Sequence, residues 1–305
     1  MIVSALTQRE RQSRLRNPGL ALRTGPFVFR IISPIASIDE GLALLYADYE
    51  LAEEAEFVDY TVVLEPVGGL RRWYKPQVRF SFDGKPPFEA LPLDHAFPLL
   101  EWAMNWCIAG QAHYHLLLHA AVIERDGLAA IMPAPPGSGK STLCAGLVNR
   151  GWRLLSDEMT IIALDTRQII PLGRPISLKN QSIEVIRAFA PDVVFNRISH
   201  ETNKGSVTHA KVPPQHLARL AETATARWVV FPKYVAGAPA TMAPHSSANS
   251  LLELGRNAFN YMVLGAEGFE VLADVVSGCD CFDFSYSNLD EAVLAFDALV
   301  HSSRE

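Results

Sequence analysis

The sequence lacks several features that would assign the protein to a class at once. It has four cysteines among 305 residues, and they form no C-x-x-C pair. No apolar stretch approaches the roughly 20 residues of a membrane span, and the N-terminus lacks the apolar core of a secretory signal. These absences argue against a disulfide-stabilised, membrane-bound or secreted protein, and we expect a cytoplasmic one.

An excess of positive charge is also missing. Lys and Arg number 27 against 33 Asp and Glu, a net charge of −6, which argues against a dedicated nucleic-acid binder. The charge is uneven, because residues 1–30 carry six arginines and one acid, whereas residues 31–70 carry no Lys or Arg. We interpret the first segment as a solvated basic arm before an acidic surface. The alternative is an arm that docks on a partner.

The chain changes character along its length. Up to about residue 95 it is mostly β, with three segments rich in β-branched and aromatic residues at 27–32, 59–65 and 77–82. An apolar helix is predicted over 99–108. Strands and helices then alternate, which is typical of an α/β core. We predict a β-rich region with a linking helix at 1–110 and an α/β domain at 111–305.

The second domain contains six predicted strands and four predicted helices. The strands are 116–124, 128–133, 152–156, 160–164, 228–231 and 281–286. The helices are 141–150, 251–264, 267–276 and 289–300.

The central motif is a phosphate-binding loop (P-loop). Residues 134–142 read Ala-Pro-Pro-Gly-Ser-Gly-Lys-Ser-Thr, which matches G-x-x-x-x-G-K-[ST] except for Ala134 at the first glycine. The glycines allow the backbone to curl so that several N–H groups face one anion, and the following helix adds its positive end. We expect ATP to bind here, with the Lys140 charge on its β and γ phosphates and the Ser141 hydroxyl on Mg²⁺. The expected nucleotide-binding residues are Pro136, Gly137, Ser138, Gly139, Lys140, Ser141 and Thr142.

Two acids follow the next predicted strand. Asp157 and Glu158 come 17 and 18 residues after Lys140, at the end of strand 152–156. A strand–loop–helix–strand unit brings that end close to the P-loop, where open α/β sheets bind ligands. One carboxylate can hold Mg²⁺ and the other can accept a proton from an attacking hydroxyl. The later strand 228–231 is followed by Pro232 and Lys233, with no acid, so this pair must carry both roles.

This ordered run resembles the catalytic domain of the HPr kinase/phosphorylase family, and in particular the HPr kinase-related proteins of bacteria. His119 lies 21 residues before Lys140, and the acid pair follows, as in the family. The resemblance covers about 50 of 305 residues. Glu158 stands where the family has Asp, and the family's downstream Glu-x-Arg signature is absent. Arg174 and Lys179 are the nearest basic candidates.

The resemblance implies a fold and a set of roles. The fold is α/β, with a P-loop kinase-like core of the phosphoenolpyruvate-carboxykinase/HPr kinase type. Asp157 would be the general base, Glu158 and Ser141 would hold Mg²⁺, and His119 would sit beside the transferred phosphate. The family also assembles into rings, so the resemblance allows a homo-oligomer, whereas the sequence itself does not fix the oligomeric state. The β-rich region does not resemble the family's regulatory domain.

The resulting expectation is an ATP- and Mg²⁺-dependent kinase that phosphorylates a hydroxyl. The acceptor is a small carrier protein, a peptide or a metabolite, with no nucleic-acid or membrane partner. Two alternatives remain: a regulatory module that binds or hydrolyses ATP without a transfer substrate, and a phosphorolase that acts on phosphoserine. A zinc site at His113, His115 and His119 is a weaker hypothesis. Cys279 and Cys281 are better explained by alternation along a strand.

Overall fold

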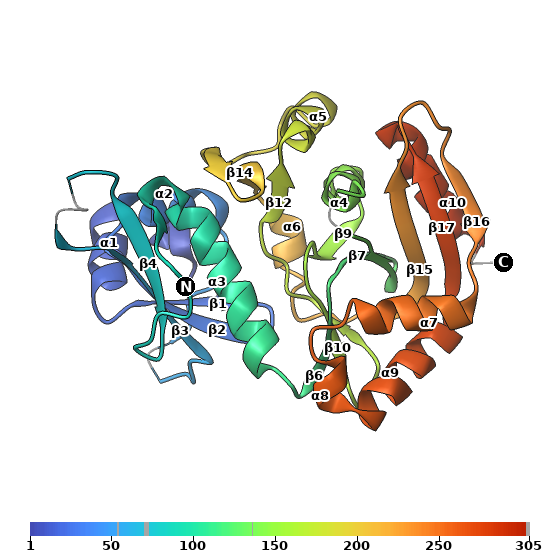
Figure 1. The fold of residues 1–305 in the computed structure, drawn as a ribbon, viewed down its shortest axis with the longest axis horizontal. Coiled ribbons are helices and arrows are strands. Elements are labelled where there is room, and N and C mark those ends of the chain that lie inside the picture. The colour runs from blue at the N-terminus through green and yellow to red at the C-terminus, as the bar shows by residue number, and fades with distance from the viewer. Residues whose placement is uncertain (54, 70–72, 136, 303–305) are drawn as a thin grey trace. The chain divides into compact units, whose positions relative to one another are not determined.

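The computed structural model describes residues 1–302 except 54, 70–72 and 136. The fold is mixed α/β with several sheets, and the chain forms two compact units. The first unit contains Met1–Gln111 and Val194–Leu217, and the second contains Ala112–Val193 and 218–305. The sequence predicted one boundary near residue 110, whereas the chain enters the second unit at 112, returns at 194 and leaves again at 218 (Figure 1).

The first unit is built on a five-stranded sheet. The strands are adjacent in the order β1 (Leu20–Thr24), β2 (Phe27–Ile32), β3 (Tyr60–Pro66), β4 (Gln77–Phe82) and β5 (Leu91–Pro92). All neighbours are antiparallel except β2 and β3, which are parallel. A parallel pair needs a crossover, and helix α2 (Ala36–Leu45) lies in that connection. The predicted strands 27–32 and 77–82 are confirmed at their exact bounds.

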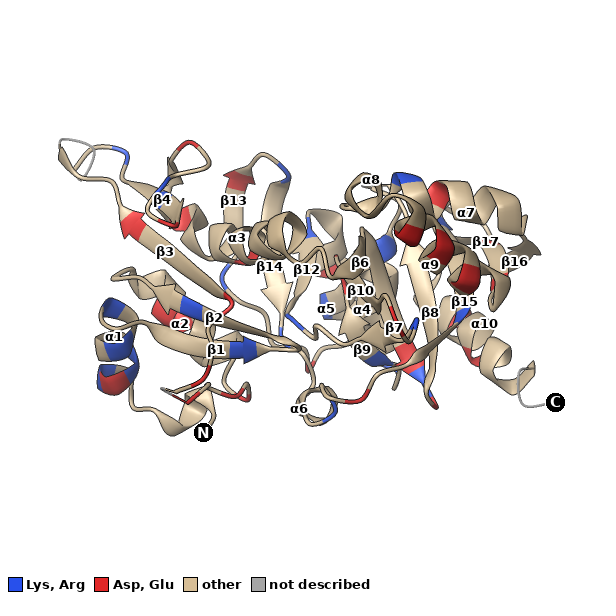
Figure 2. Ribbon diagram, turned by 90° about the horizontal axis from the view of Figure 1, so that it is seen from below, with Lys and Arg blue, Asp and Glu red and all other residues tan. Residues whose placement is uncertain are grey.

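The basic N-terminal segment is folded, so the expectation of a solvated arm is wrong. After a 3₁₀ turn at Val3–Ala5, it forms helix α1 (Gln8–Arg16), whose first turn is closed by a capping box between Thr7 and Glu10. Arg11 is buried and its Nε lies 2.5 Å from the Asp39 carboxylate of α2. Figure 2 shows the remaining basic residues along α1. The predicted helix 99–108 is the longer α3 (Ala96–Gln111).

A hairpin from the middle of the chain completes the first unit. It consists of β13 (Ser199–Thr202) and β14 (Gly205–Ala210), followed by the short helix α6 (Pro214–Leu217). The Ser199 hydroxyl donates to the Asp94 carbonyl at 2.9 Å, in the 3₁₀ turn Leu93–His95. Lys211 pairs with Asp48 at 2.7 Å. These bonds attach the hairpin region to elements about 100 or more residues earlier in the chain.

The second unit has a six-stranded and a three-stranded sheet. The larger sheet has the order β16 (Thr241–Pro244), β17 (Asp280–Tyr286), β15 (Thr225–Tyr234), β8 (Leu128–Pro133), β7 (Ala120–Arg125), β9 (Arg153–Ser156). In it, β17, β15 and β8 are parallel, and the other pairs are antiparallel. The smaller sheet has the order β11 (Ile169–Ile170), β10 (Thr160–Ala163), β6 (His115–Leu118).

Side chains of the larger sheet alternate between two cores. Ile131, Val229 and Cys281 belong to one core, which also holds Leu254 and Val271 from the helices α7 (Ser247–Arg256) and α9 (Ala266–Ser277). On the opposite face, the ring of Phe296 from α10 (Leu289–Ser302) packs against Trp152 and Phe284, and Trp152 also meets Trp228. Within the described residues, no helix has both the length and the apolar character needed to cross a membrane.

Two predicted elements are each divided in the structure. The strand 116–124 is β6 and β7, which belong to different sheets, with His119 at the break. The helix 251–264 is α7 and the single turn α8 (Tyr261–Leu264). The buried Asn260 lies between them, and its side-chain amide bonds to the Leu117 N–H and the His115 carbonyl at 3.0 and 2.7 Å. This amide satisfies backbone groups of β6 from the point where the predicted helix is divided.

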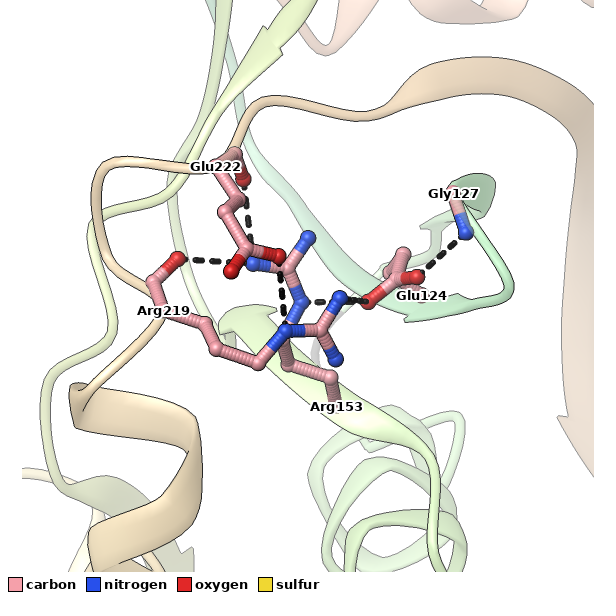
Figure 3. A network of polar contacts seen from close by, with 5 residues as sticks. All are labelled: Glu124, Gly127, Arg153, Arg219 and Glu222. Atoms are coloured by element: carbon pink, nitrogen blue, oxygen red, sulfur yellow. Dashed lines mark hydrogen bonds and ion pairs between the residues drawn. The ribbon is translucent and has the colours of Figure 1, made fainter.

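A buried charge network joins β7 to β9 and to the segment before β15. Figure 3 shows Arg153 between Glu124 and the carbonyls of Arg219 and Glu222, which its Nη1 reaches at 2.8 and 3.0 Å. Glu124 also accepts from the Gly127 N–H at 2.5 Å. Glu124 and Arg153 are 1% and 3% exposed, so removal of one partner leaves an uncompensated buried charge.

We therefore expect Glu124→Gln to destabilise the protein by about 3–5 kcal/mol. Thermal unfolding at pH 7.5 measures the effect. The matched control is Glu184→Gln, which removes an exposed ion pair to Arg187 and should change stability by less than about 1 kcal/mol. Equal melting temperatures for the two variants would show that the buried pair contributes no more than the surface one.

Candidate functional site

The glycine-rich turn joins the end of β8 to helix α4 (Lys140–Val148). Gly137 and Gly139 have φ of 86° and 89°, a region that side-chain-bearing residues rarely adopt. The carbonyls of Ser138 and Gly139 are bonded to the Tyr234 N–H and the Tyr286 hydroxyl at 2.8 and 2.9 Å. Because the carbonyls face β15 and β17, the turn is held from one side. Pro136, which the sequence predicts to bind the nucleotide, lies outside the described residues.

Gly139 has no room for a side chain. A Cβ there would lie 2.6 Å from the Tyr286 hydroxyl and 3.0 Å from the Tyr234 Cβ, in addition to its positive φ. If the turn binds a nucleotide, as expected from the sequence, Gly139→Ala should weaken that binding by about tenfold or more, because the turn must open to admit the methyl group. Gly127→Ala is the control, since Gly127 also has positive φ but nothing within 4 Å of its Cβ position. Titration calorimetry with Mg-ATP measures both, and equal affinities would contradict the tight-turn explanation.

Lys140 is the first residue of α4 and is 8% exposed. Among the described residues, none lies within hydrogen-bonding distance of its ammonium group. The buried Ser138 hydroxyl likewise lacks a hydrogen-bond partner among them. Burial lowers the pKa of Lys140, while the charges of Asp157 and Glu158 raise it. A buried cation beside α4's amino end and a glycine turn fits the phosphates of a nucleotide.

Asp157 follows β9 and is 4% exposed. Its Oδ2 accepts from the Ser177 N–H at 3.1 Å, and its buried Oδ1 has no hydrogen-bond partner among the described residues. Burial raises the pKa of Asp157 to about 6, against the opposing charge of Lys140. The negative charge of Glu158 also raises this pKa, and the positive charge of Lys179 lowers it. A carboxyl group with such a pKa can exchange a proton near neutral pH.

Glu158 is the more exposed of the two acids. Its carboxylate lies 3.4 Å from the ammonium group of Lys179, and both side chains are about 30% exposed. Lys179 ends the strand β12 (Ile176–Lys179), which also supplies the Ser177 N–H to Asp157. The second basic residue named from sequence, Arg174, is 8% exposed and lies just before β12. One short strand therefore contacts both acids of the pair.

Strand register places the predicted residues at one edge of the sheet. Ala120 pairs with Pro133, and Val122 pairs with Ser156. His119 therefore precedes the start of β7 at the same place where the glycine-rich turn follows the end of β8 and Asp157 follows the end of β9. Ser141 and Thr142, in the first turn of α4, are partly exposed there. The His119 ring packs against Phe259 at 5.7 Å, and its backbone N–H donates to the Asn257 carbonyl.

Of the other two histidines in the zinc hypothesis, His113 lies in the turn just before β6. His115 begins that strand and His119 follows its last residue, so they are at opposite ends of it. Burial lowers the pKa of His115. The described residues contain no group of three or more His, Cys, Asp or Glu suited to a metal ion, so the zinc hypothesis finds no support there. Cys279 and Cys281 are both buried in the same core, as strand alternation predicted.

Sequence reasoning missed the contacts of Ser177, Tyr234 and Tyr286. The strand predicted over 228–231 stops before Pro232. In the structure β15 continues to Tyr234, since its pairing with β8 ends at Val229 and only β17 lies beside the proline. The aromatic residues at the ends of β15 and β17 are the feature of the sequence that could have indicated these contacts.

In comparisons with known proteins, matches come from solved structures alone. No protein-family model matches the chain, and no curated protein does either. Among solved structures, the chain is similar to the HPr(Ser) kinase/phosphatase from Coxiella burnetii, at 13% sequence identity and a TM-score of 0.28. The likeness covers 62% of this chain and 95% of that one. Function is therefore inferred from the site's own geometry.

Proposed function

We propose that the protein is an ATP- and Mg²⁺-dependent phosphotransferase that passes the γ-phosphoryl group to a hydroxyl. One observation carries the proposal. Where the glycine turn starts a helix, the structure has a buried lysine ammonium with no hydrogen-bond partner among the described residues. A buried carboxyl group of raised pKa lies near it, and the charge of each group shifts the pKa of the other. A cation, helix amides and a proton acceptor at one edge are what phosphoryl transfer requires.

The turn and Lys140 bind and orient the polyphosphate. The first amides of α4 have no carbonyl partners inside the helix, so they are free to face phosphate oxygens. Lys140 compensates charge on the β and γ phosphates, and its burial keeps competing water away. Burial lowers the pKa of its ammonium group, and a bound anion opposes that shift because it favours the charged form. Positioning and charge compensation of this kind supply most of the rate in phosphoryl transfer.

The chain offers two oxygen donors for Mg²⁺. The Ser141 hydroxyl and the Glu158 carboxylate are hard oxygen ligands, which Mg²⁺ prefers together with phosphate oxygens and water. When bound, the ion supplies compensation for charge that develops between the β and γ phosphates. Glu158 must first exchange its contact with Lys179, which is long at 3.4 Å and partly exposed.

Asp157 serves as the general base. Its Oδ2 is fixed by the Ser177 N–H, so Oδ1 is the oxygen left to meet an acceptor hydroxyl. It takes the hydroxyl proton as the oxygen–phosphorus bond forms, and ADP leaves with the electron pair of the broken bond. His119, at the start of β7, is suited to contact the transferred group. The order of His119, glycine turn and acid pair supports a core of the HPr kinase type.

Incubation with γ-labelled ATP and Mg²⁺ tests the proposal. Label that appears on a hydroxyl of a co-purifying protein, an added peptide or a metabolite supports the transferase. Free labelled phosphate alone, undiminished by any acceptor, identifies a hydrolytic regulatory module instead. Release of pyrophosphate from a phosphoserine peptide and inorganic phosphate identifies a phosphorolase.

A further inference from the structure

We propose that Tyr234 is the stacking platform for the base of the bound nucleotide. This inference rests on the proposed function and extends it, because the turn and the acid pair account only for the phosphates. Tyr234 is the last residue of β15 and is 52% exposed, although most of the strand from Ala226 to Pro232 is buried. An exposed aromatic ring on a rigid strand end, beside an anion site, is suited to hold a planar ligand.

Tyr234 is fixed directly to the phosphate-binding turn. Its backbone N–H donates to the Ser138 carbonyl at 2.8 Å, and its Cβ would lie 3.0 Å from a Cβ on Gly139. Its ring meets the ring of Tyr286 edge-on, at 5.9 Å and 80°. Tyr286 is 1% exposed and donates its hydroxyl to the Gly139 carbonyl at 2.9 Å. The backbone and Cβ of Tyr234 are therefore fixed against the turn, and its ring is placed by Tyr286, which itself bonds to the turn.

Sheet order determines which end of the nucleotide faces Tyr234. In the order β17-β15-β8-β7-β9, the turn follows β8, and Asp157 follows β9 on one side. The γ-phosphate must point to that side, because the general base acts on the hydroxyl that attacks it. The base, at the other end of the triphosphate, then points toward β15 and β17. Tyr234 and Tyr286 end those two strands.

Tyr234 combines contact with the turn and an exposed ring. Tyr286 cannot serve, because it is buried and its hydroxyl is committed to Gly139. Stacking of a base on an aromatic ring is worth about 1–3 kcal/mol, and it tolerates different bases because each has a π-face. The platform therefore predicts weak discrimination between ATP and GTP, with affinity lost when the base is removed.

The test compares Mg-ATP with Mg-tripolyphosphate, which has the phosphates but no base. We expect Tyr234→Ala to weaken ATP binding about 5- to 150-fold in titration calorimetry while tripolyphosphate binding is unchanged. Alanine keeps the Cβ and the backbone N–H that touch the turn, so the phosphate site is preserved. Tyr234→Phe should bind ATP as the wild type does. Phe269→Ala is the matched control, since Phe269 is 50% exposed on α9.

Three results overturn the inference. Equal losses for ATP and tripolyphosphate would mean that Tyr234 only shapes the turn, and no loss for either would mean that the ring is not used. Wild-type protein that binds tripolyphosphate as tightly as ATP would show that no platform acts on the base. Failure of the proposed function looks different, because the wild type would then bind neither ligand.

Discussion

Lys140→Ala is expected to abolish ATP turnover, with a loss of at least about 10³-fold in kcat/KM. Lys140 Nζ is buried with no hydrogen-bond partner among the described residues, so its charge is available for phosphate oxygens and is little screened by water. A surface lysine would contribute far less in the same chemistry. Release of ADP from Mg-ATP, measured with a coupled assay, reports the effect.

Lys85→Ala is the control for that substitution, because Lys85 is exposed in the first unit. The control should keep wild-type turnover. Lys140→Ala should also be as stable as the wild type or more so, since it removes a buried cation whose pKa is lowered by burial. If a folded Lys140→Ala protein still turned over ATP, Lys140 and the glycine-rich turn would not have the role in the reaction that is proposed for them.

Asp157→Asn is expected to keep nucleotide binding and to lose transfer by about 10²–10⁴-fold. Asparagine can still accept the Ser177 N–H, so the local geometry is preserved, but it cannot take a proton. Calorimetry with Mg-ATP and transfer of labelled phosphate measure the two properties separately. The exposed Asp192 provides the control as Asp192→Asn, with unchanged transfer. Retained transfer in Asp157→Asn would refute the base role.

The pKa of Asp157 predicts how the wild type depends on pH. Because the base must be ionised and burial raises its pKa to about 6, kcat/KM should fall about tenfold per pH unit below 6 and level off above it. Asp157→Asn should lose this acid limb in its residual activity. A wild-type profile that stays flat from pH 5 to 8 would contradict the assignment.

The same pKa makes a prediction about stability. A carboxyl group whose pKa rises from 3.8 to about 6 on folding binds protons more tightly in the folded state, so stability falls as pH rises between those values. The difference is about 3 kcal/mol at neutral pH. Asp157→Asn should therefore melt at a higher temperature than the wild type at pH 7.5, while the two converge near pH 4. Function at this position costs stability.

Parts of the fold that depend on local sequence could be predicted well. Strands 27–32 and 77–82 were placed correctly because their β-branched and aromatic residues end at glycine, proline or aspartate. The positive φ of Gly137 and Gly139 likewise follows from their residue type. The helix 289–300 has nearly its predicted bounds, since the Asn288 side chain accepts from the N–H groups of its first turn.

Features that depend on distant residues could not be predicted. The Asn260 amide replaces a strand partner for β6, about 145 residues earlier, and nothing near Asn260 signals it. The Glu158–Lys179 pair depends on where β12 runs, and the ending of β15 depends on which neighbours it has at Pro232. The return of 194–217 to the first unit follows from contacts with Asp48 and Asp94. Sequence spacing does not contain these pairings.

That return has a consequence for synthesis of the chain on the ribosome. The first unit is complete only when residue 217 has emerged, 106 residues after Gln111. At about 5–20 residues per second, the delay is roughly 5–20 s. The strand and helix that carry the glycine turn therefore leave the ribosome while the first unit is still unfinished. In a chain that stalls within 112–193, the hairpin region has not yet been made. Its contact groups on Asp48, Asp94 and Phe97 would then stay uncovered.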